Sequence, residues 1–198
     1  MNNQTLKRAA DVAAAALGLL AVLPVVLGAA IAIVMADGRP AFFIQQRTGK
    51  DEVTFDLVKL RTLRSGDADD DDRRFAVGEF MRRWSIDELP SLVNILRGEM
   101  SFVGPRPLLP EYLERYSAAQ RRRHEVRPGL TGLAQVSGRN QVAWEKRFEL
   151  DVTYIDTWSI RGDLKILWRS FGALSSSGIY PESGRAQAPF LGEAESER

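Results

Sequence analysis

Residues 12–36, VAAAALGLLAVLPVVLGAAIAIVMA, form a run of 25 residues without a charged side chain, and this run decides the fold. As a continuous helix it would reach ~37 Å, which is enough to cross a hydrocarbon core of ~30 Å. A cleaved signal peptide is disfavoured, because the run is too long and Met35-Ala36-Asp37-Gly38 is a poor cleavage site. We therefore expect a membrane segment that the chain retains.

Pro24 lies at the midpoint of this run, where it removes a backbone hydrogen bond and bends a helix. Each half would be ~18 Å long, too short to span a bilayer alone. Basic residues stand on both sides of the run, so the positive-inside bias favours neither orientation: Lys7, Arg8, Arg39, Arg47 and Lys50. Both a spanning anchor that tolerates the proline and a re-entrant hairpin fit these features.

The composition of the whole chain narrows the classes of function. With 198 residues, 44% of them hydrophobic, the chain suffices for one compact catalytic domain. The 27 basic and 26 acidic residues nearly cancel, so we expect no nucleic-acid partner. The absence of cysteine removes disulfides and thiolate chemistry. The single histidine, His124, lies in an Arg-rich stretch, where a solvated helix face is the expected reading.

Beyond the apolar run, the residue pattern predicts a mainly α-helical fold with a small β-hairpin. Segments 41–44 and 53–60, joined by Thr48-Gly49-Lys50-Asp51, predict the hairpin. Apolar spacing predicts helices at 75–81, 89–96, from Pro110 onward, 141–158 and 161–174, with Gly98 as a helix stop. Residues 127–140 and the acidic run 67–72 are expected to be loops.

These elements suggest a membrane helix-hairpin (1–38), a catalytic domain (39–174) and a disordered tail (175–198). Helix 161–174 carries Trp168 and Phe171 beside arginines. That pattern suits an amphipathic helix at a membrane interface as well as a helix packed in a core.

Two adjacent acids, Asp87 and Glu88, lie in Ser85-Ile86-Asp87-Glu88-Leu89-Pro90 at the expected start of a helix. Adjacent helical residues do not share a face, so the two are no glycosidase dyad. One acid could attack an electrophile while the other holds a divalent cation. An acid pair that is merely stabilised by the helix dipole explains the same residues without chemistry.

Two longer motifs add specificity: Asn94-Ile95-Leu96-Arg97-Gly98-Glu99-Met100-Ser101-Phe102-Val103-Gly104-Pro105-Arg106-Pro107 and Arg127-Pro128-Gly129-Leu130-Thr131-Gly132-Leu133-Ala134-Gln135-Val136-Ser137-Gly138-Arg139-Asn140. Together with the acid motif they resemble the bacterial sugar transferase family, the monotopic phosphoglycosyltransferases. The resemblance extends from 7–11 through 148–151 to 163–165, and so covers most of the chain.

By this resemblance, Asp87 attacks the phosphorus of a UDP-sugar and expels UMP, while Glu88 and Asp87 hold Mg²⁺. A polyprenyl (undecaprenyl) phosphate then accepts the sugar phosphate. The family is described as re-entrant at a proline-centred kink in the bacterial inner membrane, with amphipathic interfacial helices and a cytosolic catalytic domain. This implies membrane lipids as partners and downstream glycosyltransferases of a glycoconjugate pathway. Leu23, where many small members have serine, leaves the angle of the kink at Pro24 open.

The resemblance also implies substrate-binding residues. Pro105-Arg106-Pro107 is associated with the nucleotide, although a rigid turn with a solvated arginine fits the same residues. Arg127 and Arg139 flank a glycine-rich loop whose amides could cradle phosphate. For Gln135 and Asn140, contacts to the sugar and ordinary hydrogen bonding in a loop are equally compatible.

Two other functions fit parts of the sequence. Asp69 to Asp72 resembles the Asp-x-Asp metal motif of glycosyltransferases, although solvation next to Arg73 and Arg74 explains it as well. A membrane-anchored scaffold would need no chemistry. The products separate the three: UMP for the phosphoglycosyltransferase, UDP for the glycosyltransferase and neither for the scaffold.

Overall fold

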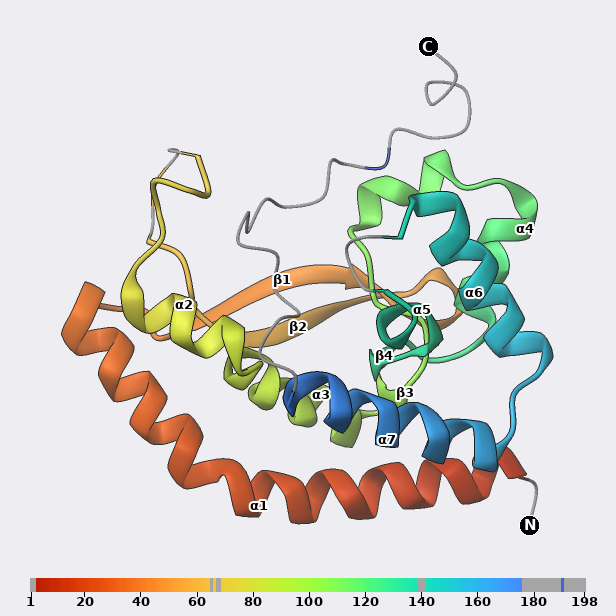
Figure 1. Ribbon diagram of the computed structural model, residues 1–198, viewed down its shortest axis with the longest axis horizontal. Coiled ribbons are helices and arrows are strands. Elements are labelled where there is room, and N and C mark those ends of the chain that lie inside the picture. Colours follow the sequence, from red (N-terminus) through yellow and green to blue (C-terminus); the bar gives the residue numbers. More distant parts are fainter. Residues whose placement is uncertain (1–2, 65, 67–68, 139–141, 176–189, 191–198) are drawn as a thin grey trace. The chain divides into compact units, whose positions relative to one another are not determined.

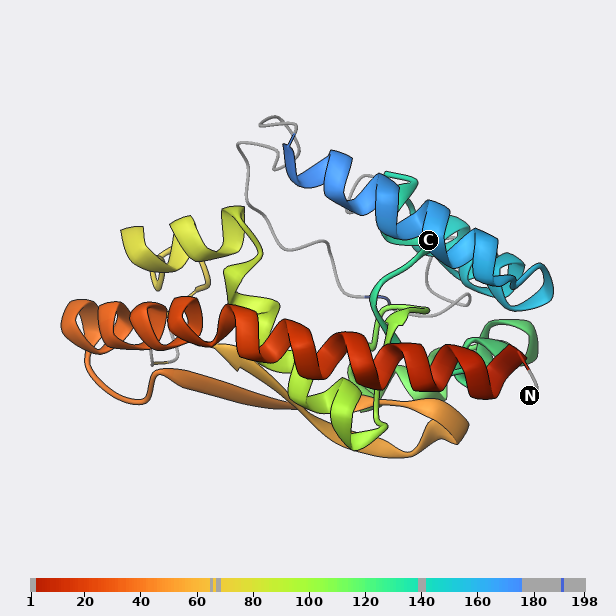
Figure 2. The same ribbon diagram turned by 90° about the horizontal axis from the view of Figure 1, so that it is seen from below.

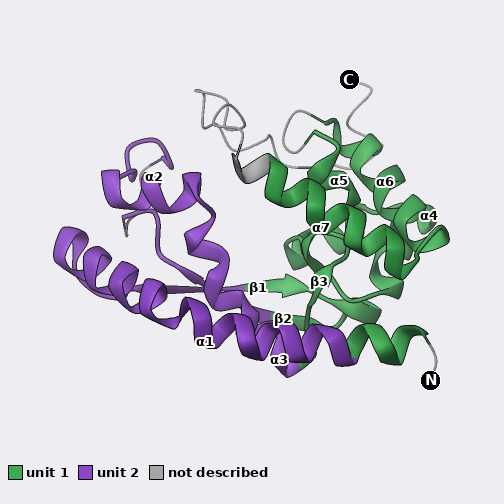
Figure 3. Ribbon diagram, turned by 60° about the horizontal axis from the view of Figure 1, so that its bottom comes forward, with its two compact units in different colours: residues 1–8, 46–55, 98–198 green, residues 9–45, 56–97 purple. Residues whose placement is uncertain are grey.

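The structure is a computed structural model that describes residues 3–64, 66, 69–138, 142–175 and 190. It is mostly helical, with two small sheets, and divides into two compact units (Figure 3). Unit 1 contains residues 1–8, 46–55 and 98–198, and unit 2 contains residues 9–45 and 56–97. This agrees with the predicted mainly α-helical class.

Helix α1 (Asn3–Asp37) contains the whole apolar run and remains helical through Pro24. The chain changes direction by a bend part-way along the helix, with no intervening turn (Figure 1). The most apolar 18-residue window has a mean hydropathy of 2.8, and only 11% of it is buried. Length, composition and exposure therefore fit a membrane segment better than a core helix.

Strands β1 (Phe42–Thr48) and β2 (Thr54–Leu60) form the predicted hairpin, a long twisted ribbon (Figure 2). The amide of Arg61 donates to the Ala41 carbonyl at one end and the amide of Gly49 donates to the Val53 carbonyl at the other. This pairing is antiparallel. The 3₁₀ turn η1 (Lys50–Glu52) joins the strands, with Asp51 and Glu52 at positive φ.

Unit 2 packs α1 against β2, α2 (Ala76–Arg83) and η2 (Ile86–Ser91). Its core contains Val26, Ile33, Leu60, Phe75 and Met81. Two side chains fix the elements to one another.

Asn94 in α3 (Leu92–Arg97) is fully buried, accepts from the Val58 amide and donates to the Asp56 carbonyl. Arg61, also buried, binds the Asp37 carboxylate at 2.8 Å and the carbonyls of Asp37 and Gly38. A cation thus satisfies carbonyls at the C-terminal end of α1.

Unit 1 is built on the parallel strands β3 (Ser101–Val103) and β4 (Gly129–Thr131). Its helices are η3 (Pro110–Arg115), α4 (Ala118–Arg121), η4 (Arg122–Glu125), α5 (Leu133–Val136), α6 (Trp144–Asp156) and α7 (Ile160–Ser175). One core joins Val103, Tyr154 and Ile166 from β3, α6 and α7. A second is aromatic and contains Leu108, Tyr112, Tyr116, Phe148 and Phe190.

Several predicted elements differ in detail. The segment 127–140, expected to be a loop, contains β4 and α5. The helices expected at 89–96 and from Pro110 begin as the 3₁₀ helices η2 and η3, with prolines at Pro90 and Pro110. Pro90 lies inside η2 and lacks an amide donor, so this turn cannot make the full α-helical set of hydrogen bonds, whereas Pro110 occupies the first position of η3, where proline is tolerated. Helix α2, the helices α6 and α7, and the stop at Gly98 agree with the prediction.

The prediction of a solvated face around His124 is wrong. His124 is buried, and its Nδ1–H donates to the Gly49 carbonyl at 3.1 Å. Burial, followed by the charge of Arg123, lowers the pKa of His124 to about 4. In the expected tail, Phe190 is buried in the aromatic core, and residues 176–189 and 191–198 lie outside the described residues.

Candidate active site

Asp87 and Glu88 occupy the first turn of η2 in unit 2, and both are half-buried. Ser85, immediately before this turn, has φ 55° and ψ 25°, a left-handed conformation that redirects the chain after α2. The Ser91 hydroxyl donates to the Glu88 carbonyl and closes the turn. The adjacent carboxylates therefore start a helix, as predicted, but it is a 3₁₀ helix.

Lys59 is a functional candidate that the sequence reasoning missed. Its Nζ lies 2.7 Å from Glu88 Oε1, with side-chain exposures of 18% for Lys59 and 20% for Glu88. The sequence does indicate an unusual role for Lys59. Strand residues alternate between faces, and Lys59 lies on the same face as the buried Phe55 and Leu57. A lysine on the buried face of a strand needs an anionic partner.

The two carboxylates provide the all-oxygen donor set that Mg²⁺ prefers. Among the described residues, no group of three or more His, Asp or Glu side chains forms a metal cage. Mg²⁺ commonly binds one or two carboxylates and completes its shell with water and substrate phosphates. Asp87 and Glu88 therefore fit a cation that binds together with a phosphorylated substrate.

In unit 1, Pro105-Arg106-Pro107 crosses the end of β3 with both prolines buried and Arg106 exposed. Four successive carbonyls of this segment accept hydrogen bonds. The Pro105 carbonyl accepts from the Gly129 amide (2.9 Å) and the Arg106 carbonyl accepts from Arg123 Nη2 (2.8 Å). The Pro107 carbonyl accepts from Arg47 Nη1 (3.4 Å) and the Leu108 carbonyl accepts from the Thr48 amide (2.9 Å). Since Pro105 and Pro107 have no amide hydrogen, these two residues are held through their carbonyls. The arginine is presented outward from a fixed backbone.

Arg123 is the buried support of this segment. Its guanidinium, 3% exposed, binds Asp151 Oδ2 at 2.8 and 3.1 Å and the Tyr116 hydroxyl at 3.0 Å. It also lies over the rings of Tyr116 and Phe148. Burial raises the pKa of the Asp151 carboxyl, and the charge of Arg123 opposes that shift. All three guanidinium nitrogens of Arg123 thus donate to groups on other segments of unit 1.

Arg147 brings a further guanidinium to the same region. It lies one helical turn before Asp151 on α6, its Nε donates to the Val142 carbonyl, and it lies 4.9 Å from the Trp144 ring centroid. Burial, then the charge of Arg106, lowers the pKa of Arg147. The i, i+4 spacing of Arg147 and Asp151 was visible in the sequence but was not used.

The first glycine of the glycine-rich loop takes part in strand pairing, while the phosphate cradle expected of the loop as a whole stays a prediction. The Gly129 amide donates to the Pro105 carbonyl and the Gly104 amide donates to the Thr131 carbonyl, so both are engaged in the β3–β4 pair. Arg127 Nε donates to the Gly98 carbonyl at 2.8 Å. These contacts assign the glycines to close backbone packing.

Gln135 is the predicted site residue with unsatisfied groups. Both polar atoms of its amide are buried and make no hydrogen bond within the described chain. A Cβ placed on Gly132 would lie 2.6 Å from Gln135 Oε1, so the amide lies against that glycine. A buried amide without partners suits a ligand or water contact. Arg139 and Asn140, the other predicted substrate-binding residues of this segment, lie outside the described residues.

The acidic run gives no support to an Asp-x-Asp metal site. Asp70 pairs with Arg73, and Asp71 pairs with Arg74 at 2.7 Å. The aspartates of both pairs are exposed. These contacts agree with a solvated loop that is neutralised locally.

Comparison with known proteins decides the family. The family profile described as bacterial sugar transferase matches residues 2–177. The chain belongs to the bacterial sugar transferase family. This confirms the resemblance inferred from the three motifs and identifies the chain as a sugar-phosphate transferase.

Curated relatives of this sugar transferase cover most of its length. An "Uncharacterized sugar transferase EpsL" of Bacillus subtilis is 48% identical, over 82% of this chain and 83% of the relative. A "UDP-glucose:undecaprenyl-phosphate glucose-1-phosphate transferase" of Caulobacter vibrioides is 43% identical, over 85% and 69%. "Exopolysaccharide production protein ExoY" of Sinorhizobium fredii is 38% identical, over 88% of each chain. Relatives whose names specify undecaprenyl phosphate, a lipid, as the acceptor indicate membrane association, as does the long apolar helix α1.

Proposed function

We propose that this chain transfers a sugar 1-phosphate from a UDP-sugar to undecaprenyl phosphate and releases UMP. The observation that carries the proposal is the Asp87-Glu88 pair at the start of η2, in a chain 43% identical to a glucose-1-phosphate transferase with that acceptor. In this role the enzyme performs the first membrane step of a glycoconjugate pathway and supplies downstream glycosyltransferases.

The reaction proceeds in two displacements at one phosphorus atom. A carboxylate oxygen of Asp87 attacks the phosphorus that bears the sugar, forming an acyl–phosphate bond, and UMP leaves with the electrons of the broken phosphoanhydride bond. A phosphate oxygen of the polyprenyl phosphate then attacks the same phosphorus, and Asp87 leaves as a carboxylate. The product is a polyprenyl diphosphate sugar, and the enzyme is regenerated.

Glu88 supports this chemistry from the neighbouring position. The Lys59 ammonium, 2.7 Å from Glu88 Oε1, orients the Glu88 carboxylate. Mg²⁺, held by Asp87 and Glu88, supplies positive charge to the phosphates when bound. Arg106, whose backbone carbonyl is held by Arg123, is the expected contact on the nucleotide side.

The membrane placement follows from the nature of the acceptor. Helix α1 enters and leaves one leaflet of the inner membrane at the bend, and the catalytic residues lie on the cytoplasmic face. The amphipathic helices around the catalytic domain then rest at the interface. A UDP-sugar from the cytosol and a phosphate held in the membrane can thereby use one nucleophile in turn.

The test is a panel of UDP-sugars incubated with the purified enzyme, undecaprenyl phosphate and Mg²⁺, with the released nucleotide identified. UDP-glucose and UDP-galactose head the panel, because relatives are named for these sugars. We expect UMP, together with a mass gain of one sugar phosphate at Asp87 when the acceptor is omitted. Asp87→Asn should abolish both signals, since an amide cannot form the ester. Release of UDP would indicate a glycosyltransferase, and no release with any donor would favour a scaffold.

A further inference from the structure

Helix α7 presents two parallel stripes of exposed side chains. One is apolar and contains Leu164, Trp168 and Phe171, which are 61%, 80% and 69% exposed. The other is basic and contains Arg161, Lys165 and Arg169, all exposed. The spacings i, i+4, i+7 and i, i+4, i+8 place each set along one side of the helix.

Within the described part of the chain, no carboxylate neutralises the basic stripe. Among the described residues, Arg161, Lys165 and Arg169 make no side-chain hydrogen bond or ion pair. Asp163, the acidic residue in the first turn of α7, is buried and bound by residues outside the basic stripe. Its carboxylate accepts from Lys7 Nζ at 2.6 Å, the Tyr154 hydroxyl at 2.9 Å and Trp158 Nε1 at 3.1 Å. A chain of net charge +1 thus concentrates uncompensated positive charge on one helix.

The arginine cluster at 121–123 provides the contrast. Arg121 pairs with Glu52 at 2.8 Å, Arg122 pairs with Glu125 at 3.0 Å and with Asp156 at 2.6 Å, and Arg123 pairs with buried Asp151. Each of these cations has its own carboxylate. The free charge on α7 is therefore a property of that helix and does not follow from the number of basic residues alone.

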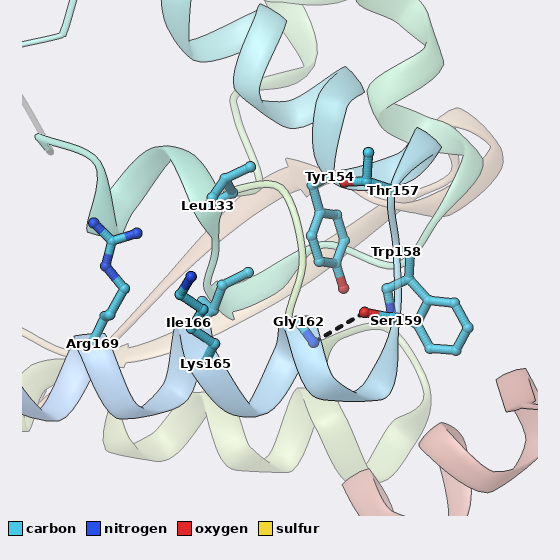
Figure 4. A pocket seen from close by; sticks show the side chains of 9 residues that line it. All are labelled: Leu133, Tyr154, Thr157, Trp158, Ser159, Gly162, Lys165, Ile166 and Arg169. Atoms are coloured by element: carbon cyan, nitrogen blue, oxygen red, sulfur yellow. Dashed lines mark hydrogen bonds between the residues drawn. The ribbon is translucent and has the colours of Figure 1, made fainter.

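A hollow of about 150 Å³, lined in part by Lys165 and Arg169, adjoins the basic stripe (Figure 4). Lys165 and Arg169 rise from successive turns of α7 along it, Leu133 and Tyr154 face them, and Trp158 lies at the end opposite Arg169. The lining is mostly apolar, with the hydroxyls of Thr157 and Ser159 at its edge. Such a hollow can hold the small polar head of a lipid whose phosphate is bound at its rim.

We propose that Lys165 and Arg169 bind the phosphate of an anionic phospholipid of the bilayer. The apolar stripe of Leu164, Trp168 and Phe171 enters the acyl boundary, which places the basic stripe at the depth of the phosphates and the headgroup over the hollow. The inference rests on the membrane placement proposed above. It adds a binding site for a structural lipid that is separate from donor and acceptor.

The test uses the full-length protein in detergent micelles with short-chain phosphatidylglycerol and phosphatidylcholine as probes, counted by native mass spectrometry. Each basic residue near anionic lipid contributes a factor of about five in affinity. The double variant Lys165→Gln/Arg169→Gln should therefore bind phosphatidylglycerol roughly twenty-fivefold more weakly, with phosphatidylcholine binding unchanged. Lys165→Arg should bind like the wild type, and added salt should weaken the wild-type complex.

A matched control removes the same charge elsewhere. Arg121→Gln/Arg122→Gln should keep the wild-type preference, and an equal loss in this variant would reduce the effect to net charge and overturn the proposal. Soluble short-chain polyprenyl phosphate should not displace phosphatidylglycerol. Displacement, with a raised KM for the acceptor in Lys165→Gln/Arg169→Gln, would assign the site to the substrate and also overturn it. Asp87→Asn should still bind phosphatidylglycerol, which separates this result from any failure of the catalytic proposal.

Discussion

Lys59 and Glu88 form a half-buried pair in which each side chain depends on the other. Their 2.7 Å contact leaves each about one fifth exposed, at 18% and 20%. Removing one partner from such a pair leaves a poorly solvated charge, which costs more than the pair contributes. Lys59 can therefore act on catalysis either through Glu88 or by itself.

Lys59→Gln should lower kcat for UMP release by about tenfold or more, because Glu88 loses the cation that orients it. Lys59→Arg should recover part of the rate. In a double-mutant cycle with Glu88→Gln, the two losses should be strongly non-additive, as expected for residues that act as one unit. Additive losses would show that Lys59 acts independently of Glu88.

Arg123 offers a second test at this scale, because it contacts the Arg106 carbonyl and never the donor itself. Arg123→Lys keeps a cation beside Asp151 but loses the fork that reaches Arg106, Tyr116 and Asp151 together. The KM for the UDP-sugar should rise about tenfold, the size of one hydrogen bond from a charged group, with kcat changed less than about threefold. Arg122→Lys on the exposed neighbouring position is the control.

The same substitution made in an Arg106→Gln background separates positioning from general damage. If Arg123 acts by holding Arg106, the Arg123→Lys substitution should raise the KM for the UDP-sugar little beyond the value that Arg106→Gln alone produces. A full further increase in KM, or a fall in kcat alone, would contradict the positioning role.

At the scale of elements, local patterns predicted the hairpin, α2, α6 and α7, because their apolar spacing matches their backbone period. The segment 127–140 was misread, because glycine and proline indicate loops locally. Here the glycines permit a contact between two backbones: a Cβ on Gly129 would lie 2.1 Å from the Gly104 nitrogen. A pairing with β3, more than twenty residues earlier in the chain, is not encoded in local periodicity.

Gly129→Ala tests this reading. The added methyl group would meet Gly104 N at 2.1 Å and Thr131 O at 2.3 Å, both backbone atoms, so β3 and β4 must separate. We expect a loss of more than about 3 kcal/mol in unfolding free energy. Gly172→Ala, with nothing within 4 Å of the new methyl group, should instead stabilise α7 by about 0.5–1 kcal/mol. Thermal unfolding of both variants in micelles gives the comparison, and equal midpoints would contradict the packing argument.

For the whole molecule, the family and the class of enzyme could be predicted from the sequence, because the motifs around Asp87, Arg106 and Arg127 are each contiguous in the chain. Their supports were not. Lys59 is 29 residues from Glu88, and Arg123 is 28 residues from Asp151. Such pairs arise from tertiary packing, which no local pattern contains. The same distinction applies to α1: its apolar length is a local property of the sequence, but its path through a membrane depends on the bend within the helix.

The topology of α1 can be read with single cysteines, since the chain has none. If α1 is re-entrant, cysteines at Asn3 and Asp51 lie on the cytoplasmic side. Both should resist an impermeant thiol reagent in intact cells and react after lysis. Labelling at Asn3 alone in intact cells would show a spanning helix. Pro24→Ala restores a backbone hydrogen bond and straightens the helix toward a length that crosses ~30 Å, so labelling at Asn3 should increase.

Gly28→Ala is the matched control, because the added methyl group has nothing within 4 Å and the same apolar run keeps its proline. It should leave both cysteines shielded, as in the parent. If Pro24→Ala also leaves them shielded, the proline does not turn the chain. The protein would then be held on one face by its interfacial helices. Helix α7, with its exposed Trp168, becomes the element to test, because loss of its apolar stripe should then release Asn3 to the far side.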